Sequence, residues 1–194
     1  MVTSKWLYKI KDGAGRSAEK YKARFVARSF SQKEGVDYDI VFAPIARYTT
    51  IRSIIALVAS QGWSLHQMDI KVAFLHGSLK KEVYLEQPQG FEVQDRRTHV
   101  YRLKKAFNGL KQARRAWYER IDSYLVKLGF MRSYVDPNLY FKVKKDMPLI
   151  LVLYVDDLFL TGDDPLIYQC KRELTYEFEM KDLGLMHYFL GLKV

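Results

Sequence analysis

The chain has 194 residues, enough for one sizeable core or for a domain with a small lobe, and its 48% hydrophobic content excludes a disordered protein. The net charge of +10 favours an anionic partner, nucleic acid first, with basic clusters at residues 1–35 and 96–120. No apolar run is long enough for a membrane helix. The lone Cys170 and the absence of a signal-peptide pattern predict a cytoplasmic or nuclear protein that is not secreted.

Alternating apolar and basic residues predict strands over residues 5–11 and 20–28, joined by a turn at 12–15. Period two places Lys22 and Arg24, with Arg28 as a further candidate, in a spaced cationic row suited to phosphate oxygens. By spacing alone, a strand face that is merely kept soluble by its charges explains the row better.

The middle of the chain predicts a loop over 31–44, an amphipathic helix over about 46–60 and a strand over 63–69 that ends at Asp69. A short strand over 83–91 leads into a loop, and a helix over 112–128 closes at Gly129. A lone Asp at a strand end is more often a cap than a metal ligand.

The C-terminal part predicts a strand over 137–143, a turn at 144–146, and an apolar run over 150–160 that Asp156 and Asp157 interrupt. We expect two buried strands with the aspartates in the tight turn between them. Two charges about 4 Å apart repel by roughly 4 kcal/mol at an effective dielectric near 20, which bound Mg²⁺ would reverse. For Asp-Asp alone, a solvated turn is the commoner explanation.

A third helix is expected over 165–179, opened by Asp164 as N-cap and Pro165 in the first turn. Residues 181–184 are expected to turn into a strand over 187–194. Lys181 lies in that turn, and exposed lysines after helices are common.

The run Tyr154-Val155-Asp156-Asp157, together with blocks at residues 67–77, 83–91 and 109–118, resembles reverse transcriptases of copia-type retrotransposons. The resemblance covers nearly the whole chain, from about Lys5. It implies an α+β polymerase palm, with an antiparallel sheet backed by helices, plus a partial fingers lobe. Residues 1–45 would form the fingers hairpin and loop, and residues 46–194 mostly palm, ending at a strand like that of the primer grip. The thumb and RNase H would be absent.

The resemblance also implies RNA-directed DNA polymerisation. Asp69, Asp156 and Asp157 would be catalytic and would hold two Mg²⁺ ions, with Mn²⁺ as a substitute. The expected partners are an RNA or DNA template with its primer, dNTPs and the remaining Pol polyprotein segments, with no membrane. The expected location is a cytoplasmic virus-like particle or the nucleus.

The resemblance assigns further roles by position. Phe74 would lie under the sugar and exclude a 2′-hydroxyl, although without the family it is an ordinary core aromatic. The nucleotide-binding residues would be Lys22, Arg24, Ala73, Phe74, Gly109, Lys111 and Gln112. Primer and template would contact Tyr154, Arg114 and Gly191. Lys181 could protonate the departing pyrophosphate.

Three positions depart from the family pattern. Asn108 and Arg114 stand where relatives usually have Tyr and Pro, and Ser29 where Gly is more frequent. A catalytically inactive, nucleic-acid-binding remnant of a degraded retrotransposon is therefore the alternative. A nuclease lacks support, because the sequence supplies no extra acidic ligands or general base for hydrolysis.

Overall fold

The computed structural model describes residues 1–11, 20–93, 99–189 and 192–193, so the predicted turn at 12–15 and Gly191 lie outside the described residues. The chain divides into two compact units. The first comprises Met1–Phe42 and Phe74–Trp117, and the second comprises Ala43–Ala73 and Tyr118–Val194. Residues 74–117 thus cluster with the N-terminal segment, and the division into fingers at 1–45 and mostly palm at 46–194 stays a prediction.

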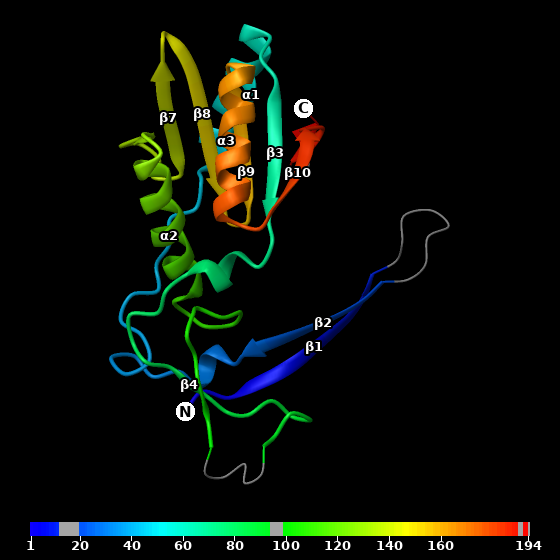
Figure 1. Cartoon of the computed structure of the whole chain (residues 1–194), viewed down its shortest axis with the longest axis vertical. Coiled ribbons are helices and arrows are strands. Elements are labelled where there is room, and N and C mark those ends of the chain that lie inside the picture. Colours follow the sequence, from blue (N-terminus) through cyan, green and yellow to red (C-terminus); the bar gives the residue numbers. More distant parts are fainter. Residues whose placement is uncertain (12–19, 94–98, 190–191, 194) are drawn as a thin grey trace. The chain divides into compact units, whose positions relative to one another are not determined.

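The described elements form an α+β protein whose named strands pair antiparallel (Figure 1). In chain order they are β1 Ser4–Lys11, β2 Lys20–Ala27, η1 Ser29–Ser31, α1 Tyr48–Gln61, β3 Leu65–Ile70, η2 Ala73–His76, β4 Tyr84–Leu85, β5 Tyr101–Arg102, α2 Ala113–Lys127, β6 Met131–Arg132, β7 Leu139–Lys144, β8 Met147–Tyr154, β9 Asp157–Gly162, α3 Asp164–Glu177, β10 Met180–Leu185, β11 Tyr188–Phe189 and β12 Leu192–Lys193. No helix among the described residues is long and apolar enough to cross a bilayer.

The first unit is built on the β1–β2 ribbon and a small apolar core. Ala27, at the end of β2, shares that core with Val2, Val83, Leu85 and the start of α2. The Val2 N–H donates to the carbonyl oxygen of the β4 residue Tyr84, and the Glu86 N–H donates to the Val2 carbonyl oxygen, which ties the N-terminus to this core. The ribbon is therefore anchored at its base.

The second unit is a six-stranded sheet in the order β10-β3-β9-β8-β7-β6. On one face, α1 packs Ile51 and Val58 in a cluster that includes Leu65, Val152 and Phe159. Side chains alternate along each strand, so the neighbouring residues point to the opposite face, where α2 and α3 lie (Figure 1). The Tyr140 hydroxyl donates to Asp122 of α2 there, and Lys171 of α3 contacts His66 of β3.

The three predicted helices are confirmed, with ends shifted by one or two residues. Gly62 follows α1 with a φ of 66°, the left-handed conformation that commonly ends a helix. The N-cap of α3 is Asp163, whose side chain accepts from the Leu166 N–H. The prediction of Asp164 as N-cap was wrong by one residue, because either of two adjacent aspartates can cap and Pro165 is compatible with both registers.

Two C-terminal predictions were wrong. Residues 181–184 belong to β10 rather than to a turn, since an edge strand tolerates the charged and glycine residues that made them look like one. The single strand expected over 187–194 is instead two short strands, β11 and β12, which pair with each other.

Candidate active site

The two adjacent aspartates lie at the β8–β9 turn. Tyr154 pairs with Asp157, so the two residues between them, Val155 and Asp156, form the turn. The expected hairpin is confirmed, although Asp157 is already the first residue of β9. Val155 has a φ of 55°, which is unusual for a β-branched residue. Such backbone strain concentrates at functional sites, so this turn is a candidate for one.

Asp69 of β3 lies directly opposite Asp157, its register partner on β9. Opposed residues of an antiparallel pair point to the same face with Cβ atoms about 5 Å apart. The Ile70 N–H donates to the Asp156 carbonyl oxygen at 2.8 Å and holds the turn against the end of β3. The carboxylates of Asp69 and Asp157 therefore meet on the α1 face, beyond the part of that face where α1 packs on Leu65 and Phe159.

The Asp157 carboxyl is half-buried in a polar setting. Burial raises its pKa above the usual range, and the Asp69 carboxylate raises it further. The Gln67 side-chain amide donates to Asp157 Oδ1 at 3.0 Å and opposes that rise. Gln67 thus orients one oxygen of Asp157, and a bound cation would stabilise the charged form of this carboxylate.

The donor chemistry of this pair fits a hard divalent cation. Carboxylate oxygens are the protein ligands that Mg²⁺ prefers, and it commonly takes only one or two of them, completing its shell with water and substrate phosphates. Within the described residues, however, no three His, Cys, Asp or Glu side chains converge closely enough to form a metal site by themselves. The structure brings Asp69 and Asp157 together and places Asp156 in the adjoining turn.

The β1–β2 ribbon in the first unit has two chemically different faces. Lys22 pairs with Lys9 and Arg24 with Leu7, which gives one exposed cationic face. The predicted strand spacing of Lys22 and Arg24 is confirmed, but Arg28 lies just beyond the end of β2.

The other face of the ribbon is aromatic. The Trp6 ring lies 5.0 Å from Phe25 and stacks on Tyr8 at 6.3 Å, between ring centroids. Phe25 continues the row to Phe107 in the core. The outer part of this face is open, because Tyr8 and Tyr21 are 77% and 75% exposed.

Gly109 approaches the end of β2 so closely that only glycine fits. An added Cβ would lie 2.1 Å from the Ala27 carbonyl oxygen, and the φ of Gly109 is 89°. The Ala27 N–H donates to the Asn108 carbonyl oxygen at 2.8 Å. The close backbone approach expected of this glycine therefore exists, and its partner in the structure is β2.

Lys111 and Gln112 bind the segment that follows β2. Lys111 Nζ donates to the Tyr38 hydroxyl at 2.8 Å and lies over that ring. The Gln112 side-chain amide donates to the Asp37 carbonyl oxygen and accepts from Gln32. These two side chains order residues 32–38.

The remaining predicted site residues occupy several environments. Ala73 is buried at the start of η2, and Phe74 packs against the core of the first unit. Arg114 is exposed in the first turn of α2. The Tyr154 ring is half-buried and lies edge-on to Phe189, with 5.2 Å between centroids. Gly191 lies outside the described residues.

Sequence reasoning missed two features of the sheet that carries the carboxylates. Gln67 stands two residues before Asp69, so strand periodicity could have placed it on the same face. Lys171 of α3 is buried against His66 and Asp182, and no local pattern distinguished it from an exposed helical lysine.

The whole chain, residues 1–194, matches the family described as Reverse transcriptase (RNA-dependent DNA polymerase). Carboxylates paired across neighbouring strands, beside the β8–β9 turn, fit this class of metal-dependent nucleotidyltransferases, and the chain belongs to the reverse transcriptase family.

The curated relatives are Pol polyproteins of copia-type retrotransposons. The chain is 43% identical over 192 residues to the retrovirus-related Pol polyprotein from transposon TNT 1-94 of Nicotiana tabacum, covering 98% of this chain and 14% of that protein. It is 38% identical over 194 residues to that from transposon RE1 of Arabidopsis thaliana, covering 100% of this chain and 13% of that protein. The chain thus spans about one-seventh of these relatives' length, and no solved structure matches it.

Proposed function

We propose that this chain is the palm and part of the fingers of a retrotransposon reverse transcriptase and catalyses RNA-directed DNA synthesis. The reaction would join a dNTP to a primer 3′-hydroxyl on an RNA or DNA template. The observation that carries the proposal is the half-buried pair Asp69 and Asp157, aligned across β3 and β9 with Asp156 in the adjoining turn.

Asp69, Asp156 and Asp157 would hold two Mg²⁺ ions, or Mn²⁺ in their place. The ions would supply activation of the primer 3′-hydroxyl and charge neutralisation of the departing pyrophosphate. Gln67 keeps Asp157 oriented through its hydrogen bond, so the carboxylate would not have to reorganise when substrate binds.

Lys181 would donate the proton that the departing pyrophosphate takes up. It is the register partner of Asp69, so its exposed side chain lies on the same face as the two carboxylates. The primer 3′-hydroxyl would give its proton to water, and its oxygen would bond to the α-phosphorus. The bond from that phosphorus to the bridging oxygen would break, and this oxygen would take the proton from the Lys181 ammonium. Water would return a proton to Lys181.

The incoming nucleotide would be held mainly by the first unit. Lys22 and Arg24 are exposed on one ribbon face and suit the triphosphate oxygens. Phe74, with Ala73, would lie under the sugar and reject a 2′-hydroxyl by steric overlap. The nucleotide base or the template would contact Gly109, Lys111 and Gln112. The backbone that these residues order would make the contact.

The template and primer would extend over further residues. Arg114 and Gly191 would contact the nucleic-acid backbone, and Tyr154 the primer end. The exposed Tyr8 and Tyr21 suit stacking with unpaired template bases, and the opposite face of the ribbon carries cations for the phosphates. The other Pol polyprotein segments would be partners, inside a virus-like particle or the nucleus.

Primer extension by the purified chain on an RNA template, with dNTPs and Mg²⁺, tests the proposal. We expect extension that disappears in an Asp156→Asn variant. Salt-sensitive binding of primer–template without extension would instead support the nucleic-acid-binding remnant. Neither extension nor binding would contradict both functions for this chain.

A further inference from the structure

β10 is an edge strand that buries little of its own side-chain surface. It forms one edge of the six-stranded sheet, and a bulge between Asp182 and Gly184 interrupts its pairing with β3. Of its six residues, all within the described part of the chain, only Met180 is buried. An edge strand with an interrupted ladder and little apolar burial opens easily, so its register needs another anchor.

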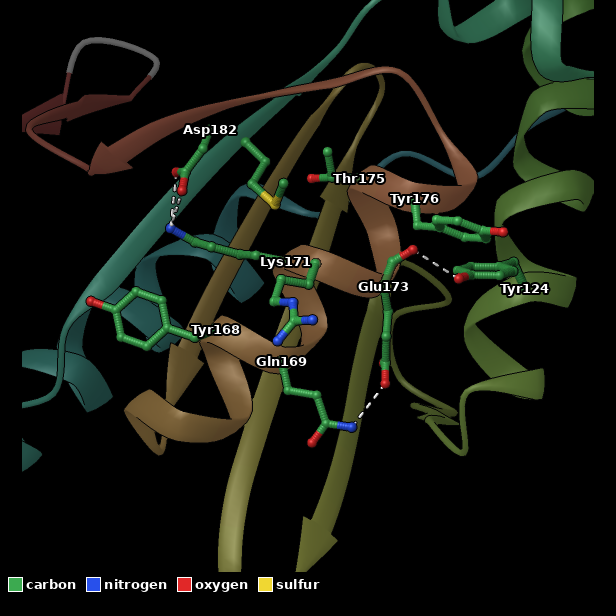
Figure 2. Close-up of a pocket in the computed structure, with 10 residues that line it drawn as sticks. Tyr124, Tyr168, Gln169, Lys171, Glu173, Thr175, Tyr176 and Asp182 are labelled. Atoms are coloured by element: carbon green, nitrogen blue, oxygen red, sulfur yellow. Dashed lines mark hydrogen bonds and ion pairs between the residues drawn. The ribbon is translucent and has the colours of Figure 1, made fainter.

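Lys171 supplies such an anchor from α3. Its side chain points from the helix toward β10, and its Nζ lies 2.9 Å from both carboxylate oxygens of Asp182 (Figure 2). Asp182 Oδ1 also accepts from the Gly184 N–H at 2.9 Å, so the same carboxylate closes the bulge. The ion pair therefore holds the irregular part of β10.

The ammonium of Lys171 also contacts β3. Its Nζ lies 2.9 Å from His66 Nδ1. Because an ammonium can only donate, Nδ1 accepts and the neutral ring carries its proton on Nε2. One buried charge thus connects α3, the edge strand and the strand that carries Asp69.

This arrangement is electrostatically demanding. Lys171 is 6% exposed, and burying an ammonium costs several kcal/mol unless good partners compensate. Burial alone would raise the pKa of Asp182, but the hydrogen bonds from Lys171 and the Gly184 N–H outweigh it and lower that pKa. Apolar packing would stabilise the helix without these charges, but it would not select one register of β10.

The register of β10 decides what lies beside the carboxylates. Asp182 faces the helices, so its neighbour Lys181 faces the opposite side of the sheet. There Lys181 pairs with Asp69, and Asp69 pairs with Asp157. A one-residue slip would move Lys181 to the helix side.

We propose that Lys171 is a positioning residue for nucleotidyl transfer, which fixes β10 through Asp182 and thereby holds Lys181 beside Asp69. This inference rests on the proposed polymerase function and adds a residue remote from the reacting atoms. Lys171 and Asp182 also line a groove beside α3, so this ion pair supports β10 from the helix side of the sheet.

Hydrogen exchange tests the anchor directly. In Lys171→Met and Asp182→Asn, amides of residues 180–185 should exchange about tenfold faster, while those of β8 stay protected. Arg172→Met is the matched control, because Arg172 is an exposed cation on the same helix, and it should change neither. Unchanged exchange of β10 in both Lys171→Met and Asp182→Asn would overturn the proposal.

Single-nucleotide incorporation tests the consequence. Lys171→Met should lower kcat by about 10- to 100-fold with little change in KM for dNTP, since misplacing a catalytic group costs that much. In a Lys181→Gln background the same substitution should cost nothing further. An equal loss in both backgrounds would show that Lys171 does not act through Lys181. If the unmodified chain extends no primer, the proposed function fails, whereas the exchange comparison still decides whether Lys171 anchors β10.

Discussion

Gln67 is the residue through which the candidate metal ligands can be tested without removing one of them. Its amide holds Asp157 Oδ1, as partners of metal ligands commonly do. Gln67→Leu should lower the rate of nucleotide incorporation about 10- to 100-fold, with the fold retained. Gln61→Leu, at the exposed end of α1, is the control and should leave the rate unchanged. Equal rates in the two variants would mean that orienting Asp157 is unimportant.

His66 makes the stability of the second unit depend on pH. Burial lowers the pKa of His66, and the neighbouring Lys171 ammonium lowers it further, whereas Asp164 and Asp182 act in the opposite direction. Tyr168 of α3 also packs on the ring, and Leu160 is the register partner on β9. The native state therefore favours the neutral ring more than the unfolded chain does.

The sign of the pH effect follows from that difference. Below about pH 6.5 the unfolded chain binds a proton before the native protein does, so the free energy of unfolding falls until the lower native pKa is reached. His66→Gln should lose this part of the pH dependence, which denaturant unfolding at pH 7.5 and pH 5.5 would measure. The same decrease in both proteins would assign the dependence to other groups.

At the scale of elements, the contact between the Gly109 loop and β2 should be a major determinant of stability. Gly109→Ala would place a methyl group 2.1 Å from the Ala27 carbonyl oxygen. We expect a loss of more than about 2 kcal/mol in unfolding free energy, measured by denaturant titration. Gly90→Ala is the control, because its φ of 86° is similar but nothing lies within 4 Å. It should cost only about 1–2 kcal/mol, and equal losses would contradict the close approach.

The two faces of the β1–β2 ribbon should separate two binding functions. Replacing Lys22 and Arg24 by Gln should raise KM for dNTP, because the cationic face loses its charge. Replacing Tyr8 and Tyr21 by Ser should weaken binding to a template with an unpaired overhang, at about 1–3 kcal/mol per stacked base. Steady-state kinetics and fluorescence anisotropy measure the two effects. Loss of both functions in both variants would mean that the ribbon acts as one structural element.

The elements that sequence predicted well are those with strong local patterns. The apolar positions of α1 and the interrupted run around Asp156 and Asp157 each fit one periodicity, and both are confirmed. β10 was missed because its stability comes from Lys171 and from pairing with β3, and neither contact is visible within residues 180–185. The pairing of Asp69 with Asp157 is similarly non-local, and it was expected only from the family resemblance.

At the scale of the whole molecule, the net charge of +10 agrees with an anionic substrate. The candidate carboxylates would repel such a substrate, and a bound metal ion would neutralise this repulsion. Family membership extends over residues 1–194. The central claim is therefore that Asp69 and Asp157 together bind the catalytic metal.

Titration of the purified chain with Mn²⁺, followed by electron paramagnetic resonance in the presence of dNTP and primer–template, tests that claim most directly. We expect bound Mn²⁺ that is lost in both Asp69→Asn and Asp157→Asn. It should persist in Asp146→Asn, which changes an exposed aspartate in the β7–β8 turn whose left-handed backbone Asn tolerates. Undiminished Mn²⁺ binding in the Asp69 and Asp157 variants would show that these two carboxylates do not bind the metal.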